Sequence, residues 1–217
     1  RVLAAGVPAG RVVFAGVGKS EAEIDRALAA GVRHLNVESL PELERIARVA
    51  THRQVRAPVG LRVNPEVDPQ THPYIATGLK EAKFGLSMAD VAAAGELIRT
   101  TPALELVSLG CHIGSQLTRT APFGDAVSRV VELVDAWAAR GLAVGCLDVG
   151  GGLGISYDGE PVPGVAEYAG VIRGAIGGRR LEVLLEPGRS VVGPAGLLLT
   201  RVEYVKRGER RNFVIVD

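Results

Sequence analysis

The sequence has little of what marks metalloproteins, membrane proteins or nucleic-acid-binding proteins. Its 217 residues include only two cysteines, neither in a C-x-x-C pair, and four scattered histidines. We therefore expect no metal site, and reduced thiols in a cytoplasmic protein. No apolar run approaches the ~18 residues of a membrane span. The net charge of +1 creates no field for nucleic acid or anionic lipid, so we expect a small-molecule partner.

The sequence does contain a regular alternation of strand-like and helical segments. The strand-like runs are mostly continuous apolar sequence, which is typical of parallel strands covered on both faces. They span residues 12–17, 34–37, 59–64, 104–114, 142–149 and 181–186, and amphipathic helices are predicted over 21–30, 41–50, 89–100, 126–140 and 165–176. Six such units predict an α/β fold with a parallel sheet, either doubly wound or closed as a barrel.

Polar, glycine-rich sequence follows the end of nearly every strand, and this favours the barrel. The carboxyl ends of all barrel strands converge on one mouth, where active sites of this fold lie. After residue 190 the pattern changes to two β-rich runs, 197–205 and 213–216, joined by a polar turn. We predict a partial (β/α)8 TIM-type barrel over 1–192 and the start of an antiparallel β-domain over 193–217. The chain lacks an initiator methionine and stops inside an apolar run, so we expect the interior of a longer protein.

Three glycines, Gly150 to Gly152, follow the strand that ends at Val149. Glycines at such a turn leave N–H groups open to an anion, although they also serve turns that need only their dihedral angles. The dinucleotide fingerprint fails because Ile155 stands where it requires glycine, and a P-loop at 16–20 fails because of Val13. The loop therefore suggests a phosphate of unspecified origin. Lys19, at another strand end, is predicted to belong to an ordinary polar loop rather than to form a Schiff base.

Two further strand ends carry chemistry. His112 begins the segment His112-Ile113-Gly114-Ser115-Gln116, and we expect its ring to face the barrel mouth. Glu186 and Arg189 lie in Glu186-Pro187-Gly188-Arg189. A carboxylate suits a protonated ring nitrogen, and a guanidinium suits a carboxylate or phosphate. An anion loop, a flat ring contact and a carboxylate together suit a phosphorylated aromatic cofactor.

Five motifs in order give the chain a family resemblance. They are residues 61–65, residues 77–80 with 83–85, residues 112–116, residues 148–154 and residues 186–189. The set resembles the diaminopimelate decarboxylases, pyridoxal-phosphate-dependent enzymes of the alanine-racemase-like barrel class, within the class-II ornithine, lysine and arginine decarboxylases. The resemblance covers essentially the whole chain. It implies decarboxylation of meso-2,6-diaminopimelate to L-lysine and CO2, with the substrate joined to the cofactor as an imine.

The resemblance also implies roles for individual residues. The matching histidine, His112, is expected to stack on the cofactor ring, and Glu186 is expected to pair with the ring nitrogen, so both are catalytic candidates. The remaining cofactor-binding candidates are those that hold the phosphate or adjoin it: Gly151, Gly152, Pro187, Gly188 and Arg189. Arg189 is also expected to bind a substrate carboxylate.

The chain departs from the family pattern in two places. It has neither the Tyr-Ala-x-Lys-type motif of the Schiff-base lysine nor the Cys-Glu-Ser motif that the partner subunit donates. The chain alone is therefore expected to be inactive, and the full-length protein is expected to form a homodimer. The alternatives are a related ornithine, arginine or carboxynorspermidine decarboxylase, and a non-catalytic pyridoxal-phosphate carrier barrel.

Overall fold

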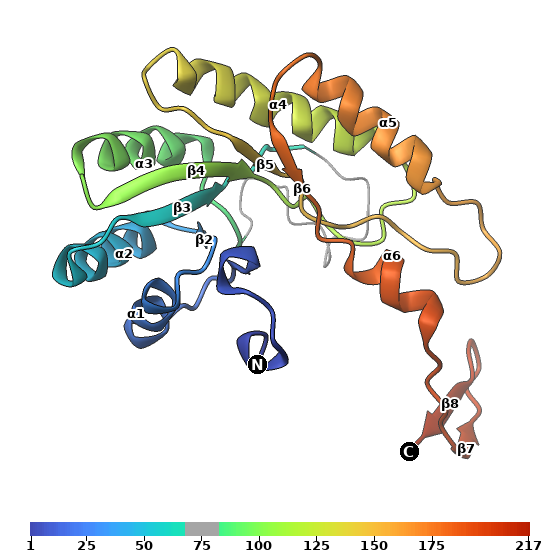
Figure 1. Ribbon diagram of the computed structural model, residues 1–217. Coiled ribbons are helices and arrows are strands. Elements are labelled where there is room, and N and C mark those ends of the chain that lie inside the picture. Colours follow the sequence, from blue (N-terminus) through green and yellow to red (C-terminus); the bar gives the residue numbers. More distant parts are fainter. Residues whose placement is uncertain (68–82) are drawn as a thin grey trace.

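A single parallel sheet organises most of the chain. The computed structural model describes residues 1–67 and 83–217. The sheet has six strands in the order of the sequence, so that each strand pairs with the next one along the chain. The strands are β1 (Val13–Phe14), β2 (His34–Val37), β3 (Ala57–Arg62), β4 (Leu104–Gly110), β5 (Cys146–Asp148) and β6 (Glu182–Leu184). Figure 1 shows that the sheet curls as part of a barrel does, which confirms the predicted partial barrel.

Five long helices cover the outer, convex face of the sheet (Figure 1). They are α1 (Glu21–Ala30), α2 (Leu40–Arg53), α3 (Met88–Thr100), α4 (Ala121–Ala138) and α5 (Val165–Ile176). Short 3-10 helices at Leu3–Ala5 and Ala9–Arg11 precede β1. Among the described residues, no helix is long and apolar enough to cross a membrane.

Local sequence explains where the helices begin and end. Ser20 and Glu23 form the predicted capping box, because the Ser20 side chain accepts from the Glu23 N–H while the Glu23 side chain accepts from the Ser20 N–H. Gly31 ends α1 with a φ of 69°, a left-handed conformation that glycine adopts without strain. Helix α4 starts five residues before the predicted position, because Pro122 fits a first helical turn.

Alternation along the strands separates an apolar layer from a polar interior. Leu35, Val37 and Leu147 belong to one buried apolar cluster with the helix residues that cover the sheet. Asn36 and Asp148, on the opposite face of the same strands, meet inside the curl, where Asn36 Nδ2 donates to Asp148 Oδ2 at 3.2 Å. The hydrophobic core therefore lies between sheet and helices, and the concave face carries polar side chains.

The last part of the chain forms a separate hairpin. A short helix α6 (Gly188–Val192) and a 3-10 helix (Gly193–Ala195) follow β6, and both were missed from the sequence. Strands β7 (Val202–Lys206) and β8 (Phe213–Val216) then pair antiparallel, as the sequence predicts. The domain division at 192/193 stays a prediction. The motif at 77–80 lies outside the described residues.

Candidate functional site

The carboxyl ends of the strands meet around one small cavity on the concave side of the sheet. Its lining comes from the ends of all six strands and the loops that follow them: Ala15, Asn36, Leu61, Arg62, Gly110, Cys111, His112, Asp148 and Glu186. Two of the predicted site residues, His112 and Glu186, are thus brought together from positions 74 residues apart in the chain (186 minus 112).

The triple glycine packs directly against the ends of the two neighbouring strands. A Cβ on Gly151 would lie 2.1 Å from the carbonyl oxygen of Glu186, and one on Gly152 would lie 2.3 Å from that of Gly114. Gly150 and Gly152 also have positive φ angles of 71° and 110°. These glycines are therefore required for close backbone approach and for conformation, whether or not an anion binds.

The loop also fixes the ring of His112. The N–H of Gly151 donates to Nδ1 of His112 at 3.1 Å. Because Nδ1 accepts this bond, the ring proton of neutral His112 lies on Nε2. Burial lowers the pKa of His112, and the nearby Arg62 guanidinium lowers it further. The result is a neutral, oriented ring at the cavity wall.

Two carboxyl groups lie side by side at the same cavity. Asp148 is buried, and its Oδ1 accepts from the N–H of Gly150 at 3.0 Å while its Oδ2 accepts from Asn36. Burial, the charge of Asp148 and a hydrogen bond with Asp148 together raise the pKa of Glu186 to about 7. The Glu186 side chain as a whole is exposed along the edge of β6. The direction of the shift nevertheless holds, because the carboxyl group itself faces the cavity and a like charge.

Arg62 and Glu38 form a second charged pair at the mouth. Arg62 Nη1 donates to Glu38 Oε1 at 3.2 Å. Glu38 also accepts from the N–H groups of Gly85, at 3.1 Å, and Gly16, at 3.3 Å. The sequence analysis missed Asn36, Glu38 and Arg62 as site residues. The signal was present for β2, where polar residues at 34, 36 and 38 share one face of the strand.

The segment after Glu186 begins helix α6, and Pro187, Gly188 and Arg189 are not part of the cavity lining. The N–H of Gly188 donates to the Glu186 carbonyl oxygen at 2.8 Å, and Pro187 is the N-cap of α6. Arg189 Nη1 donates to the hydroxyl of Tyr157 at 2.7 Å, with its guanidinium 5.9 Å from the Tyr157 ring centroid. Tyr157 was missed because it lies in the long loop after the glycines, where no periodicity points to a role.

Lys19 is a structural residue in the loop between β1 and α1, and its side chain is buried there. Its ammonium group is buried and donates to the carbonyl oxygens of Gly16 and Asn36 and to Glu42 Oε1, each at 2.6 Å. Three acceptors occupy all three of its donors. Lys19 is therefore fixed in place by these acceptors and is unsuited to act as a nucleophile.

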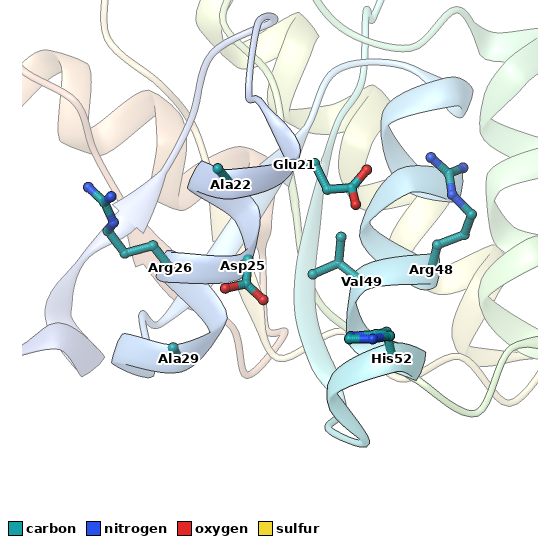
Figure 2. Close-up of a pocket in the computed structure, with 8 residues that line it drawn as sticks. All are labelled: Glu21, Ala22, Asp25, Arg26, Ala29, Arg48, Val49 and His52. Atoms are coloured by element: carbon teal, nitrogen blue, oxygen red, sulfur yellow. The ribbon is translucent and has the colours of Figure 1, made fainter.

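A larger groove of about 800 Å³ lies on the outer face, between α1 and α2. Figure 2 shows Glu21 and Asp25 on the α1 side and Val49 and His52 on the α2 side, with Arg26 directed away from α2. Asp25 is paired with Arg53 at 2.6 Å. The groove lies outside the curl of the sheet and contains none of the predicted site residues, so the chemistry belongs to the smaller cavity.

Comparison with known proteins relates the chain to one family. Residues 1–193 match the family described as pyridoxal-dependent decarboxylase, pyridoxal binding domain. Diaminopimelate decarboxylases of Neisseria meningitidis serogroup B and Pseudomonas aeruginosa are 54% and 52% identical over the whole chain, which covers 52% of each. A solved Helicobacter pylori diaminopimelate decarboxylase, in complex with L-lysine, superimposes with a TM-score of 0.91 at 41% identity and covers 99% of this chain and 54% of its own. The chain thus spans about half the length of the relatives it matches.

Proposed function

The chain belongs to the pyridoxal-dependent decarboxylases, and from that premise we propose that the whole protein converts meso-2,6-diaminopimelate to L-lysine and CO2. The sequence identity of more than 50% to diaminopimelate decarboxylases, over the whole length of the chain, supports this substrate. So does the similarity to an enzyme solved with L-lysine, the expected product. We further propose a cytoplasmic homodimer, by analogy with the family.

The chemistry of the residues at the cavity suits pyridoxal phosphate, the cofactor of this family. A carboxyl pair at the end of β5 and β6 suits a protonated ring nitrogen, because a cation there relieves the repulsion between Asp148 and Glu186. We assign the ring nitrogen to Glu186, the ring face to His112, and the phosphate to the backbone of Gly151, Gly152, Gly188 and Arg189, with Pro187 setting the start of α6. When bound, the cofactor supplies a sink for the electron pair that remains on the substrate when its carboxylate leaves as CO2.

The protein residues have defined tasks in this reaction. Glu186 in its ionised form holds the proton on the ring nitrogen, which keeps the electron sink effective. His112, neutral and oriented by Gly151, provides a flat wall without adding a charge beside the ring. Arg189 is proposed to bind a substrate carboxylate, and for this its guanidinium must exchange Tyr157 for the substrate.

The observation that carries the proposal is the position of the Glu186 carboxyl group, which lies beside Asp148 and lines the same cavity as His112. This arrangement has no evident structural benefit, because two like charges in a partly desolvated place destabilise each other. It has a clear functional benefit if a cation is to bind there.

The test is CO2 release by the full-length protein with added pyridoxal phosphate. Meso-diaminopimelate, ornithine and arginine are offered in parallel, with wild type and Glu186→Ala. Release from meso-diaminopimelate, lost in Glu186→Ala with cofactor binding largely retained, supports the proposal. Release only from ornithine or arginine would move the substrate to the related decarboxylases. No release from any substrate, with cofactor bound, would favour a carrier.

A further inference from the structure

The proposed reaction assigns no task to Asp148, although this residue is buried and firmly held at the cavity. Its side chain is 4% exposed, and both carboxylate oxygens accept hydrogen bonds, one from Gly150 and one from Asn36. A Cβ on Gly110 would lie 2.7 Å from the Cβ of Asp148, so the absence of a side chain at Gly110 lets β4 pack closely against Asp148. Asp148 is therefore a fixed acid directly behind Glu186.

The other groups around Glu186 are either uncharged or already paired with another residue. Arg62, from β3, faces the cavity but is engaged by Glu38, from β2, at 3.2 Å. His112, after β4, is a neutral ring bonded to Gly151. From β1 only Ala15 lines the cavity. The Cys111 thiol carries no charge, because burial raises its pKa to about 12. The nearest group that is both charged and in hydrogen-bonding contact with Glu186 is thus Asp148.

We propose that Asp148 is a positioning residue whose fixed charge keeps Glu186 basic, so that the pair holds one proton in the cofactor-free protein and Glu186 binds the protonated ring nitrogen in the loaded protein. This inference rests on the proposed function. In the free protein the proton bridges the two carboxyl groups. On loading, that proton would leave to solvent as the Glu186 carboxylate accepted a hydrogen bond from the ring N–H, so the release would approach one proton for each cofactor bound at pH values below about 7. No electron transfer or further reactant is involved.

The test is the pH dependence of cofactor affinity in the full-length protein. Pyridoxal 5'-phosphate is titrated into wild type, Asp148→Asn and the control Asp135→Asn, whose carboxylate lies on the outer surface beside Arg179. In wild type and in the control, affinity rises with pH through a midpoint near 7. In Asp148→Asn the midpoint moves toward acid by about one pH unit or more, because a like charge has been removed. The same titration is run with 1-deazapyridoxal 5'-phosphate, which lacks the ring nitrogen and leaves Glu186 protonated, so its affinity shows no such step.

Each outcome decides the inference. An unshifted midpoint in Asp148→Asn, or an equal step with the deaza compound, overturns the role of Asp148 and leaves the proposed function intact. Failure of the wild-type protein to bind pyridoxal phosphate at all overturns the proposed function, and this inference with it. If Asp148→Asn does not fold, carbon-13 NMR of the wild-type, cofactor-free protein decides instead. A midpoint near pH 7 at the Glu186 carboxyl carbon supports the inference, and a midpoint at the ordinary glutamate value overturns it.

Discussion

The N–H of Gly151 donates to Nδ1 of His112 at 3.1 Å. A residue of the glycine loop after β5 therefore sets the orientation of a ring that lies just after β4. We predict that His112 is neutral with its proton on Nε2 at neutral pH, and that its titration midpoint lies below the ordinary histidine value of about 6.5. Nitrogen-15 NMR of the full-length protein, with exposed His52 as the internal reference, measures both properties. A proton on Nδ1 at neutral pH would contradict the bond.

Gly151→Ala is expected to destabilise the protein and abolish cofactor binding. The new Cβ would lie 2.1 Å from the carbonyl oxygen of Glu186, and a backbone atom cannot rotate away. We expect a loss of at least 1–3 kcal/mol, roughly the cost of overpacking a filled site. Gly174→Ala in α5 is the matched control, because its Cβ meets nothing within 4 Å and alanine favours a helix interior by about 0.5–1 kcal/mol. Urea unfolding compares them, and equal stability of the two variants would refute the packing argument.

Lys19→Met is expected to cost about 3–5 kcal/mol of unfolding free energy, because it leaves the buried Glu42 carboxylate without its ion partner. Arg99→Met provides the comparison. It breaks the exposed pair with Glu96 and should change the urea midpoint little, since surface pairs contribute little. A small effect of Lys19→Met would mean that solvent reaches Glu42 in solution.

Stability is expected to fall in mild acid, with His34 as one cause. The ring is fully buried on the concave face, and burial lowers its pKa below 6.5. A depressed folded-state pKa contributes stability above the unfolded pKa, and this is lost as pH falls from about 6.5 through the folded value. Urea midpoints at about pH 7.5 and pH 5.5 should therefore differ less in His34→Asn than in wild type. His52→Asn, at an exposed position, serves as the control and should leave the difference between the two urea midpoints unchanged. If His34→Asn shows the same difference as wild type, the loss of stability in acid has another cause.

Arg189→Lys is expected to raise the KM for meso-diaminopimelate by about tenfold or more, because a point charge replaces a two-pronged donor. Tyr157→Phe removes the hydroxyl that Arg189 now contacts and should have a smaller effect, or lower KM by freeing the guanidinium. Steady-state kinetics of the two variants separates these cases. If Arg189→Lys leaves both the KM and the cofactor affinity unchanged, Arg189 does not bind substrate or cofactor.

Much of the fold was readable from the sequence because apolar continuity marks buried strands. The positions of β2, α1 and α5 agree with the sequence to the residue. Strand ends were less accurate. The run 142–149 predicts eight residues where β5 has three, because apolar residues such as Val144 are buried without joining the ladder. Composition reports burial, whereas strand length depends on backbone pairing.

The candidate site was predictable to the extent that a parallel sheet brings strand ends together. That rule places His112, Gly151 and Glu186 at one mouth, as found. It does not reveal which inward side chains meet, since this depends on register. The contact of Asn36 with Asp148 joins two strands 112 residues apart in the chain, and no local pattern announces it.

Glu38 has a practical consequence for anyone wishing to change what the protein accepts. One carboxylate holds Gly16 after β1, Arg62 at the end of β3 and Gly85 in the loop that follows, so these three loops cannot be varied independently. A mutant library that randomises a single loop would mostly sample strained combinations. Libraries that keep Glu38 and its three donors, and place diversity around Tyr157 instead, should retain far more folded variants.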